Sequence, residues 1–360
     1  MAHLALYRRY RPKTFSEVVG QKSIIQTLTN SLKNDKISHA YLFCGQRGTG
    51  KTTIARLLAK SINCTDNKSF EPCNKCDSCM EINEGRSMDL IEIDAASNRG
   101  IDEIRNLKEG VRFSPIKSKN KIFIIDEVHM LTKEAFNALL KTLEEPPEHA
   151  IFILATTEPE KLPATIISRT QRFDFKKLTL KEIAERLRLL AKNEKIDISD
   201  EAVKEIALSA EGSLRDAESL LDQLISLGYE EINFQTLEEV LGRVNFEKIN
   251  QFLGFLAKKD SSEAIRLINK IYDDGADLIE FNKAVLKNLR KILLLKANAD
   301  TEKILKDELT KEQLEALKKL AEKFDIKELK KLMDEFLKAK EAIKHSPIPT
   351  LPLELIAFEL

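Results

Sequence analysis

The segment that most constrains the fold is a glycine-rich stretch between an apolar run and a helical pattern. The run ends at Phe43, and the helical pattern covers Thr53–Leu58. Between them lies a match to G-x-x-x-x-G-K-[ST], formed by Gly45, Gln46, Arg47, Gly48, Thr49, Gly50, Lys51 and Thr52. A strand, this loop and a helix together predict a phosphate-binding loop, in which backbone N–H groups surround the phosphates of a nucleotide.

The loop also carries two side chains with defined chemistry. Lys51 would place a positive charge at the β- and γ-phosphates of ATP, and Thr52 would offer its hydroxyl to Mg²⁺. The predicted ligands of this segment are therefore ATP and Mg²⁺. An ordinary glycine-rich turn is the alternative.

Four short apolar runs in the first half of the chain predict a parallel sheet. They cover 40–43, 90–93, 122–125 and 151–154, and helical stretches separate them. Each run has the length and the branched or aromatic content of a buried strand, and this alternation is typical of βαβ units. The expected fold class is therefore α/β.

Two carboxylates, Asp126 and Glu127, directly follow the third run. Asp126 would help to hold Mg²⁺, and Glu127 would polarise the water that attacks the γ-phosphate. Such a pair alone more often belongs to a solvated loop. A phosphate loop about 75 positions earlier favours the catalytic interpretation.

Four of the five cysteines lie close together in the sequence. Cys64, Cys73, Cys76 and Cys79 have the spacing C-x8-C-x2-C-x2-C, while Cys44 stands apart beside the phosphate loop. Four thiolates close a tetrahedral Zn²⁺ sphere and leave no position for water, so the predicted role is structural. Four unrelated buried thiols and an iron–sulfur cluster are the alternatives.

Composition limits the location of the protein and the class of partner. The chain of 360 residues has 58 Lys+Arg against 58 Asp+Glu, which argues against nucleic-acid binding through bulk positive charge. The first residues lack the apolar core of a signal peptide, and no apolar run approaches the length of a membrane span. We expect a cytoplasmic protein without membrane contact.

The pattern changes along the chain and predicts three domains. A nucleotide-binding domain is expected over 1–177, with a zinc module near 64–79. A small helical domain is expected over 178–242. The remainder, 243–360, has only two glycines and is rich in Leu, Lys and Glu, which predicts an all-helical domain.

These motifs together resemble the gamma/tau family of AAA+ ATPases in the bacterial DNA polymerase III clamp loader. The match is dense over 1 to about 242; beyond that it depends on length and helical character. Besides the phosphate loop and the four cysteines, the matching segments are Tyr10–Pro12 with Phe15, Val18–Gln21, Ile91–Ser97, Asp126–Leu131, Asn137–Pro147, Leu154–Pro159, Ser168–Arg169 and Gly212–Ala217.

The resemblance implies roles for further residues. Thr157 corresponds to sensor 1, and Arg215 in the helical lid corresponds to sensor 2. Arg169 corresponds to the arginine finger, which acts on ATP held by a neighbouring subunit, although Thr170 replaces the family's usual Cys. The implied adenine pocket includes Tyr10, Arg11, Pro12 and Val19. Without the resemblance, both arginines would be taken as solvated, and His129 is equally compatible with a role beside the site or in packing.

The resemblance also implies an assembly. The expected architecture is an AAA+ domain with a zinc-binding insertion, a lid and a helical collar. The expected function is ATP-driven loading of a sliding clamp onto primer–template DNA in the nucleoid, as part of the polymerase III holoenzyme. The implied partners are delta, delta prime and further copies of the chain; contacts with single-strand-binding protein and polymerase would be indirect.

Two other functions are compatible with parts of the sequence. A different AAA+ motor, such as a Holliday-junction helicase, would lack the cysteine insertion, and a nucleotide-insensitive scaffold subunit would have a broken phosphate loop. For DNA contact, Arg99 and Arg105 are candidates on a loop and a helix that could line a channel. A pair of solvated arginines is the alternative.

Overall fold

The computed structural model contains two units. The boundary between them follows Asn233. The described residues are 4–66, 70–98, 100–229, 231–233, 236–237, 246–297, 309 and 311–358, without the side chains of 101–103, 105, 106 and 311. Arg99 and the side chain of Arg105, the two candidates for DNA contact, lie outside this description.

A five-stranded parallel sheet forms the centre of the first unit. Its order is β2-β3-β4-β1-β5. The strands are β1 (Ala40–Cys44), β2 (Leu90–Asp94), β3 (Lys121–Asp126), β4 (Ala150–Thr156) and β5 (Gln171–Asp174). Cys44 pairs with Thr156 and Asp94 with Asp126, so the carboxyl ends of four strands meet at one edge. Open α/β sheets bind their ligands at this edge.

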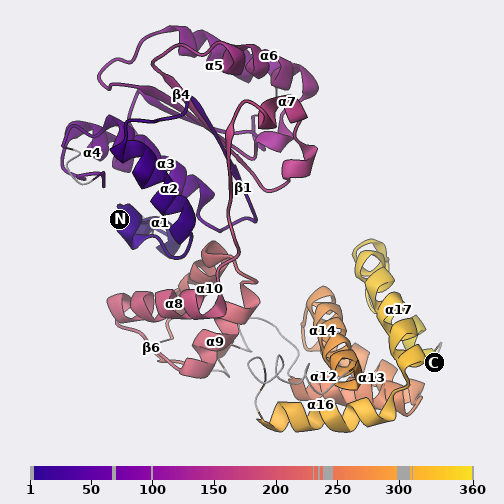
Figure 1. Ribbon diagram of the computed structural model, residues 1–360. Helices are drawn as coiled ribbons and strands as arrows, with labels where there is room; N and C mark the ends of the chain where they lie inside the picture. Colours follow the sequence, from indigo (N-terminus) through magenta and orange to yellow (C-terminus); the bar gives the residue numbers. More distant parts are fainter. Residues whose placement is uncertain are drawn as a thin grey trace. The chain divides into compact units, whose positions relative to one another are not determined.

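Helices cover both faces of the sheet (Figure 1). α5 (Ile101–Arg112) and α6 (Lys133–Glu144) pack on the face that presents Phe123 and Phe152, whose rings stack with centroids 5.3 Å apart. α2 (Lys22–Lys33) and α3 (Lys51–Asn63) pack on the face that presents Tyr41 and Phe43. Successive residues of a strand point to opposite faces, so each buried strand contributes to both cores.

Shorter elements connect these layers. They are α1 (Leu6–Arg9), η1 (Phe15–Glu17), α4 (Asp77–Glu84), η2 (Val128–Met130), η3 (Pro159–Lys161) and α7 (Ala164–Ile167). After β5 the same unit continues into three helices, α8 (Leu180–Glu194), α9 (Asp200–Ser209) and α10 (Leu214–Ser226). A small parallel pair, β6 (Asp197–Ile198) with β7 (Glu231–Ile232), accompanies them. We call this helical part the lid.

The second unit is helical in its described residues. It contains α12 (Phe246–Ala257), α13 (Ser261–Asp273), α14 (Leu278–Ala297), α16 (Lys311–Lys323), α17 (Ile326–His345) and α18 (Leu351–Phe358). Phe252 packs edge-on against Phe281 and Phe336 at the centre of its core. Among the described helices, none is both long and apolar enough to cross a lipid bilayer.

The predicted fold class is confirmed: a parallel α/β sheet, a helical lid and a helical C-terminal unit are all present. All four predicted strands form, but β2 is not buried as predicted: its residues are half-buried or exposed. β5 and the β6–β7 pair were not predicted from the sequence. β5 reads Gln-Arg-Phe-Asp and buries only Phe173, so it lacks the apolar run of the other strands. The two boundaries between the three predicted domains remain predictions.

Candidate nucleotide-binding site

A cavity of about 470 Å³ opens at the carboxyl edge of the sheet. The phosphate loop, the N-terminal segment and the lid all contribute to it. Its lining consists of Tyr7, Arg11, Pro12, Val18, Val19, Arg47, Gly48, Thr49, Gly50, Lys51, Thr52, Thr53, Asp94, Ala96, Asp126, Glu127, Leu178, Leu214, Arg215 and Glu218. This volume suits a small ligand, and its lining combines charged groups with apolar side chains.

The phosphate loop ends in helix α3, whose first residue is Lys51. Gly48 and Gly50 have φ angles of 77° and 100°, a region that favours glycine. The first N–H groups of a helix have no partner within it, so those of α3 are available to an anion. The loop backbone therefore has the shape that phosphate binding requires.

The Lys51 side chain lies folded against this loop. Its Nζ donates to the carbonyl oxygens of Gly45 at 2.7 Å and Gln46 at 3.0 Å. Burial lowers the pKa of the Lys51 ammonium, while the carboxylates of Glu127 and Asp126 act in the opposite direction. A phosphate group would offer this buried cation stronger acceptors than the carbonyl oxygens do.

The hydroxyl of Thr52 and the carboxylate of Asp126 meet at the end of β3. Thr52 Oγ1 donates to Asp126 Oδ2 over 2.6 Å. Both residues line the cavity, next to the loop. A hydroxyl and a carboxylate are the hard oxygen ligands that Mg²⁺ prefers, so the pair fits the predicted ion.

Glu127 is held in place by Thr157. Its Oε2 accepts hydrogen bonds from the Thr157 N–H at 3.1 Å and the Thr157 Oγ1 at 2.8 Å. His129 Nδ1 lies 3.4 Å from the same oxygen and 3.0 Å from Thr156 Oγ1. Its Nε2 lies 3.2 Å from Glu158 Oε1. The structure therefore places His129, whose role the sequence left open, in contact with the candidate base.

The lid closes the other side of the cavity. The Leu214 N–H donates to the Gly48 carbonyl over 3.1 Å. The Arg215 guanidinium lies 4.6 Å from the centre of the Tyr7 ring, and hydrogen bonding to Arg215 lowers the pKa of the Tyr7 phenol. Arg215, predicted as sensor 2, therefore faces the nucleotide cavity of its own subunit.

The apolar part of the lining was only partly predicted. Arg11, Pro12 and Val19 line the cavity as expected for an adenine pocket. Tyr10 instead contacts the lid, through a hydrogen bond from its hydroxyl to Glu194. Val18 and Leu214 also line the cavity and lie in segments that match the family, but neither was named as a site residue. Tyr7 precedes the recognised motif, and Leu178 and Glu218 reach the cavity only because the lid folds back onto the loop, so no local pattern indicated these three.

Arg169 lies at a different place on the first unit. It follows α7, and its Nη2 pairs with Glu144 Oε1 at 2.8 Å. This pair belongs to a separate hollow, whose other lining residues are Ser38, His39, Leu143, Ser168, Thr170 and Gln171. The structure thus separates Arg169 from the phosphate loop of its own subunit.

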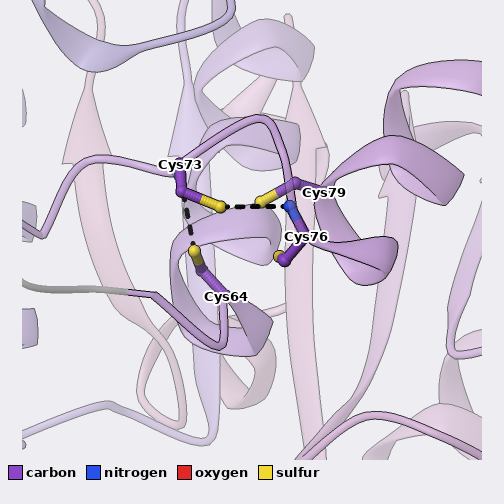
Figure 2. A group of neighbouring side chains, drawn as sticks. All are labelled: Cys64, Cys73, Cys76 and Cys79. Carbon is purple, nitrogen blue, oxygen red and sulfur yellow. Dashed lines mark hydrogen bonds between the residues drawn. The ribbon is translucent and has the colours of Figure 1, made fainter.

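The four clustered cysteines come together at α4 (Figure 2). Their Sγ atoms all lie within 4.8 Å of one another. The backbone N–H groups of Lys75 and Cys76 donate to Cys73 Sγ at 3.4 and 3.3 Å. Burial raises the pKa of the Cys79 thiol, so a thiolate there needs a nearby cation. Spacing, convergence and N–H···S contacts all fit a tetrahedral metal such as zinc.

A parallel sheet with this loop, carboxylate pair and helical lid defines a nucleotide-binding protein of the AAA+ class. Three family profiles match along the chain: DNA polymerase III, delta subunit over 20–179; DNA polymerase III clamp loader subunit, ATPase lid domain over 182–230; and DNA polymerase III subunits gamma and tau domain III over 232–359.

Curated relatives make the assignment more specific. DNA polymerase III subunit gamma of Buchnera aphidicola from Acyrthosiphon pisum is 36% identical over 99% of this chain and 98% of its own length. Subunit tau of Bacillus subtilis is 42% identical over all of this chain, which spans 63% of that protein. The chain belongs to the DNA polymerase III gamma/tau family. A solved structure of Thermotoga maritima RuvB is 20% identical, with a TM-score of 0.48. The match covers 69% of this chain and 79% of the RuvB chain, and it adds nothing to the assignment.

Proposed function

We propose that the chain is the ATP-hydrolysing motor subunit of a bacterial clamp loader. One observation carries this proposal: in a gamma/tau family chain, a single cavity joins the phosphate loop, the Thr52–Asp126 pair, Glu127 and Arg215. These are the groups needed to bind ATP, place Mg²⁺ and orient an attacking water.

Each group has a proposed role in hydrolysis. The loop amides and Lys51 hold the β- and γ-phosphates, and Thr52 with Asp126 holds Mg²⁺, which neutralises developing charge. Glu127 polarises the attacking water. Thr157 donates a hydrogen bond to Glu127. Its proposed role is to lie beside the γ-phosphate and to hold the base in place. Arg215 reaches the phosphates from the lid.

Arg169 is proposed to act on ATP bound to the neighbouring subunit. Its placement in a hollow of its own, paired with the half-exposed Glu144, supports this role, because the guanidinium can be presented to another molecule. An arginine brought to the γ-phosphate is worth about 10³–10⁵ in rate. An isolated subunit should therefore bind ATP and hydrolyse it poorly.

Mixing two inactive variants tests this arrangement. Lys51→Ala subunits have a defective site and an intact finger, whereas Arg169→Ala subunits have an intact site and no finger. Mixed assemblies contain some interfaces that join an intact site to an intact finger, so ATP hydrolysis should reappear on mixing. Subunit exchange is verified in parallel with differently tagged chains.

A mixture that stays inactive although exchange is verified would contradict action in trans. Arg169 would then serve its own site or the fold. Lys177→Ala, at an exposed lysine that does not line the cavity among the described residues, is a matched control for removing a surface cation. Mixed with Lys51→Ala, it should behave like the wild-type chain.

The assembly and its metals complete the proposal. The partners would be delta, delta prime, further copies of this chain, the sliding clamp and primer–template DNA, with ATP and Mg²⁺ in the cavity and Zn²⁺ on the four cysteines. The site of action would be the cytoplasm, at the nucleoid. The intact phosphate loop disfavours a nucleotide-insensitive scaffold, and the gamma/tau relatives disfavour a Holliday-junction motor.

A further inference from the structure

We propose that the cysteine module holds one wall of the nucleotide pocket in place. The cysteine module is defined here as Cys64–Asp66 together with Phe70–Gly85. The pocket wall is the segment Arg11–Val19, and the positioning residues are Lys60 and Glu71. The inference extends the proposed function, since it depends on nucleotide binding in the cavity described above.

The pocket wall has two sides. On one side, Arg11, Pro12, Val18 and Val19 line the cavity. On the other side, the backbone between Lys13 and Ser16 faces the cysteine module. A displacement of that backbone would therefore move the cavity lining with it.

Glu71 joins the module to the wall through two hydrogen bonds. Its Oε2 accepts from the Phe15 N–H at 2.6 Å and its Oε1 from the Ser16 N–H at 2.9 Å. These amides begin the short helix η1, where N–H groups have no partner within the helix. One carboxylate thus fixes the orientation of two consecutive peptide groups, and hydrogen bonds to a charged acceptor are among the stronger ones.

Lys60 joins the module, the wall and the phosphate-loop helix at one point. It lies on α3 and is only 2% exposed. Its Nζ donates to the Lys13 carbonyl at 3.0 Å, to Asn83 Oδ1 at 2.8 Å and to Asn74 Oδ1. An ammonium has three donors and no acceptor, so all three are used.

Two of the three acceptors of Lys60 belong to the cysteine module. Asn74 lies between Cys73 and Cys76, and Asn83 lies on α4, the helix that also carries Cys79. Asn74 Nδ2 also donates to the Lys13 carbonyl at 3.1 Å. Four thiolates around a divalent ion would keep a net negative charge, which the buried ammonium nearby would offset. Filling the cysteine site would thus fix Asn74 and Asn83, and through them the wall.

The effect on binding should depend on which part of the nucleotide is involved. The phosphate loop takes the phosphates, while the apolar side chains of Pro12, Val18 and Val19 suit a base and its ribose. A loose wall should weaken binding of the nucleoside but not of the phosphates. If the wall is correctly arranged in about a tenth of the molecules, the apparent Kd for ATP rises about tenfold.

The experiment compares ATP with inorganic tripolyphosphate, which lacks the nucleoside. Equilibrium titrations use the full chain as wild type, Glu71→Ala, Cys76→Ser and the double variant, with zinc content measured in each. Glu84→Ala is the matched control, because Glu84 lies in the same module but is exposed and pairs with Arg86.

The expected result is selective. Glu71→Ala keeps its zinc, and its Kd for ATP rises about tenfold while its Kd for tripolyphosphate stays unchanged. Cys76→Ser contains no zinc and shows the same change in the two Kd values. The double variant binds ATP no more weakly than either single variant, since both substitutions loosen the same wall. Glu84→Ala binds both ligands like the wild type.

Three results would overturn the inference. Wild-type ATP affinity in Glu71→Ala would show that the wall does not depend on the module. An equal loss of affinity for ATP and for tripolyphosphate would indicate general damage to the fold. If Glu84→Ala lost as much ATP affinity as Glu71→Ala, the effect would not be specific to the contact between Glu71 and the wall. If Cys76→Ser does not fold, Lys60→Met takes its place, with the same expected selectivity. A wild-type chain that binds no ATP would refute the proposed function itself, a distinct outcome.

Discussion

Gly48 carries a specific prediction about how the lid and the phosphate loop fit together. A Cβ at Gly48 would lie 1.9 Å from Ser213 Oγ and 3.0 Å from Ser213 Cβ. Ser213 is 1% exposed and caps α10 by accepting the Asp216 N–H at 3.3 Å. Gly48→Ala must therefore turn the Ser213 hydroxyl out of its capping position and push against the Cβ atoms of Ser213 and Arg215, the latter at 3.3 Å, whereas an added Cβ at Gly50 meets nothing within 4 Å.

The size of the effect follows from the difference between these two glycines. Both have positive φ angles, so alanine at either position costs about 1–2 kcal/mol of backbone strain. Gly48→Ala alone also loses the helix cap, worth about 1 kcal/mol, and overpacks a buried contact at about 1–3 kcal/mol. It should therefore destabilise the docked lid by about 2–4 kcal/mol more than Gly50→Ala does.

Hydrogen exchange of the α10 amides, measured without nucleotide, gives this difference directly. The opening free energy of α10 sets the exchange rate, so Gly48→Ala should exchange about 30- to 700-fold faster than Gly50→Ala. Equal exchange in the two variants, or faster exchange in Gly50→Ala, would refute the inferred contact between the loop and the lid.

Two further predictions concern the chemistry and the metal. Lys51→Ala should abolish ATP hydrolysis and keep the fold, and Glu127→Gln should bind ATP but hydrolyse it about 10²–10⁴-fold more slowly; normal turnover in either would move that role to another residue. Metal analysis of protein purified without chelator should find one zinc per chain, and Cys76→Ser should lower the melting temperature. Absence of zinc, or an unchanged melting temperature, would contradict a structural metal site.

The sequence predicted β1, β3 and β4 well because these strands are buried along nearly their whole length, whereas β2 was predicted from its apolar residues although it is partly exposed. Residues 122–125 and 151–154 form unbroken apolar runs. A strand in a parallel sheet that is buried on both faces needs apolar side chains at successive positions. β5 was missed because an edge strand with one buried residue has no such run. The β6–β7 pair is two residues per strand, too short for any periodic pattern.

For the candidate site, local motifs indicated residues but not their surroundings. The phosphate loop, Asp126 and Glu127 were recognised because their spacing lies within short segments. Tyr7 was missed because its place in the site depends on Arg215, which is far away in the sequence. Lys60 gave no signal either, since its three acceptors belong to residues 13, 74 and 83. The catalytic roles remain predictions.

The most direct test of the central claim is ATP hydrolysis by the chain assembled with delta and delta prime. The rate is measured with the sliding clamp, with primed DNA, with both and with neither, and a four-way DNA junction replaces primed DNA as a control. A clamp-loader motor should hydrolyse ATP fastest when clamp and primed DNA are both present. A rate that is indifferent to both, or that a four-way junction stimulates equally well, would contradict the assignment.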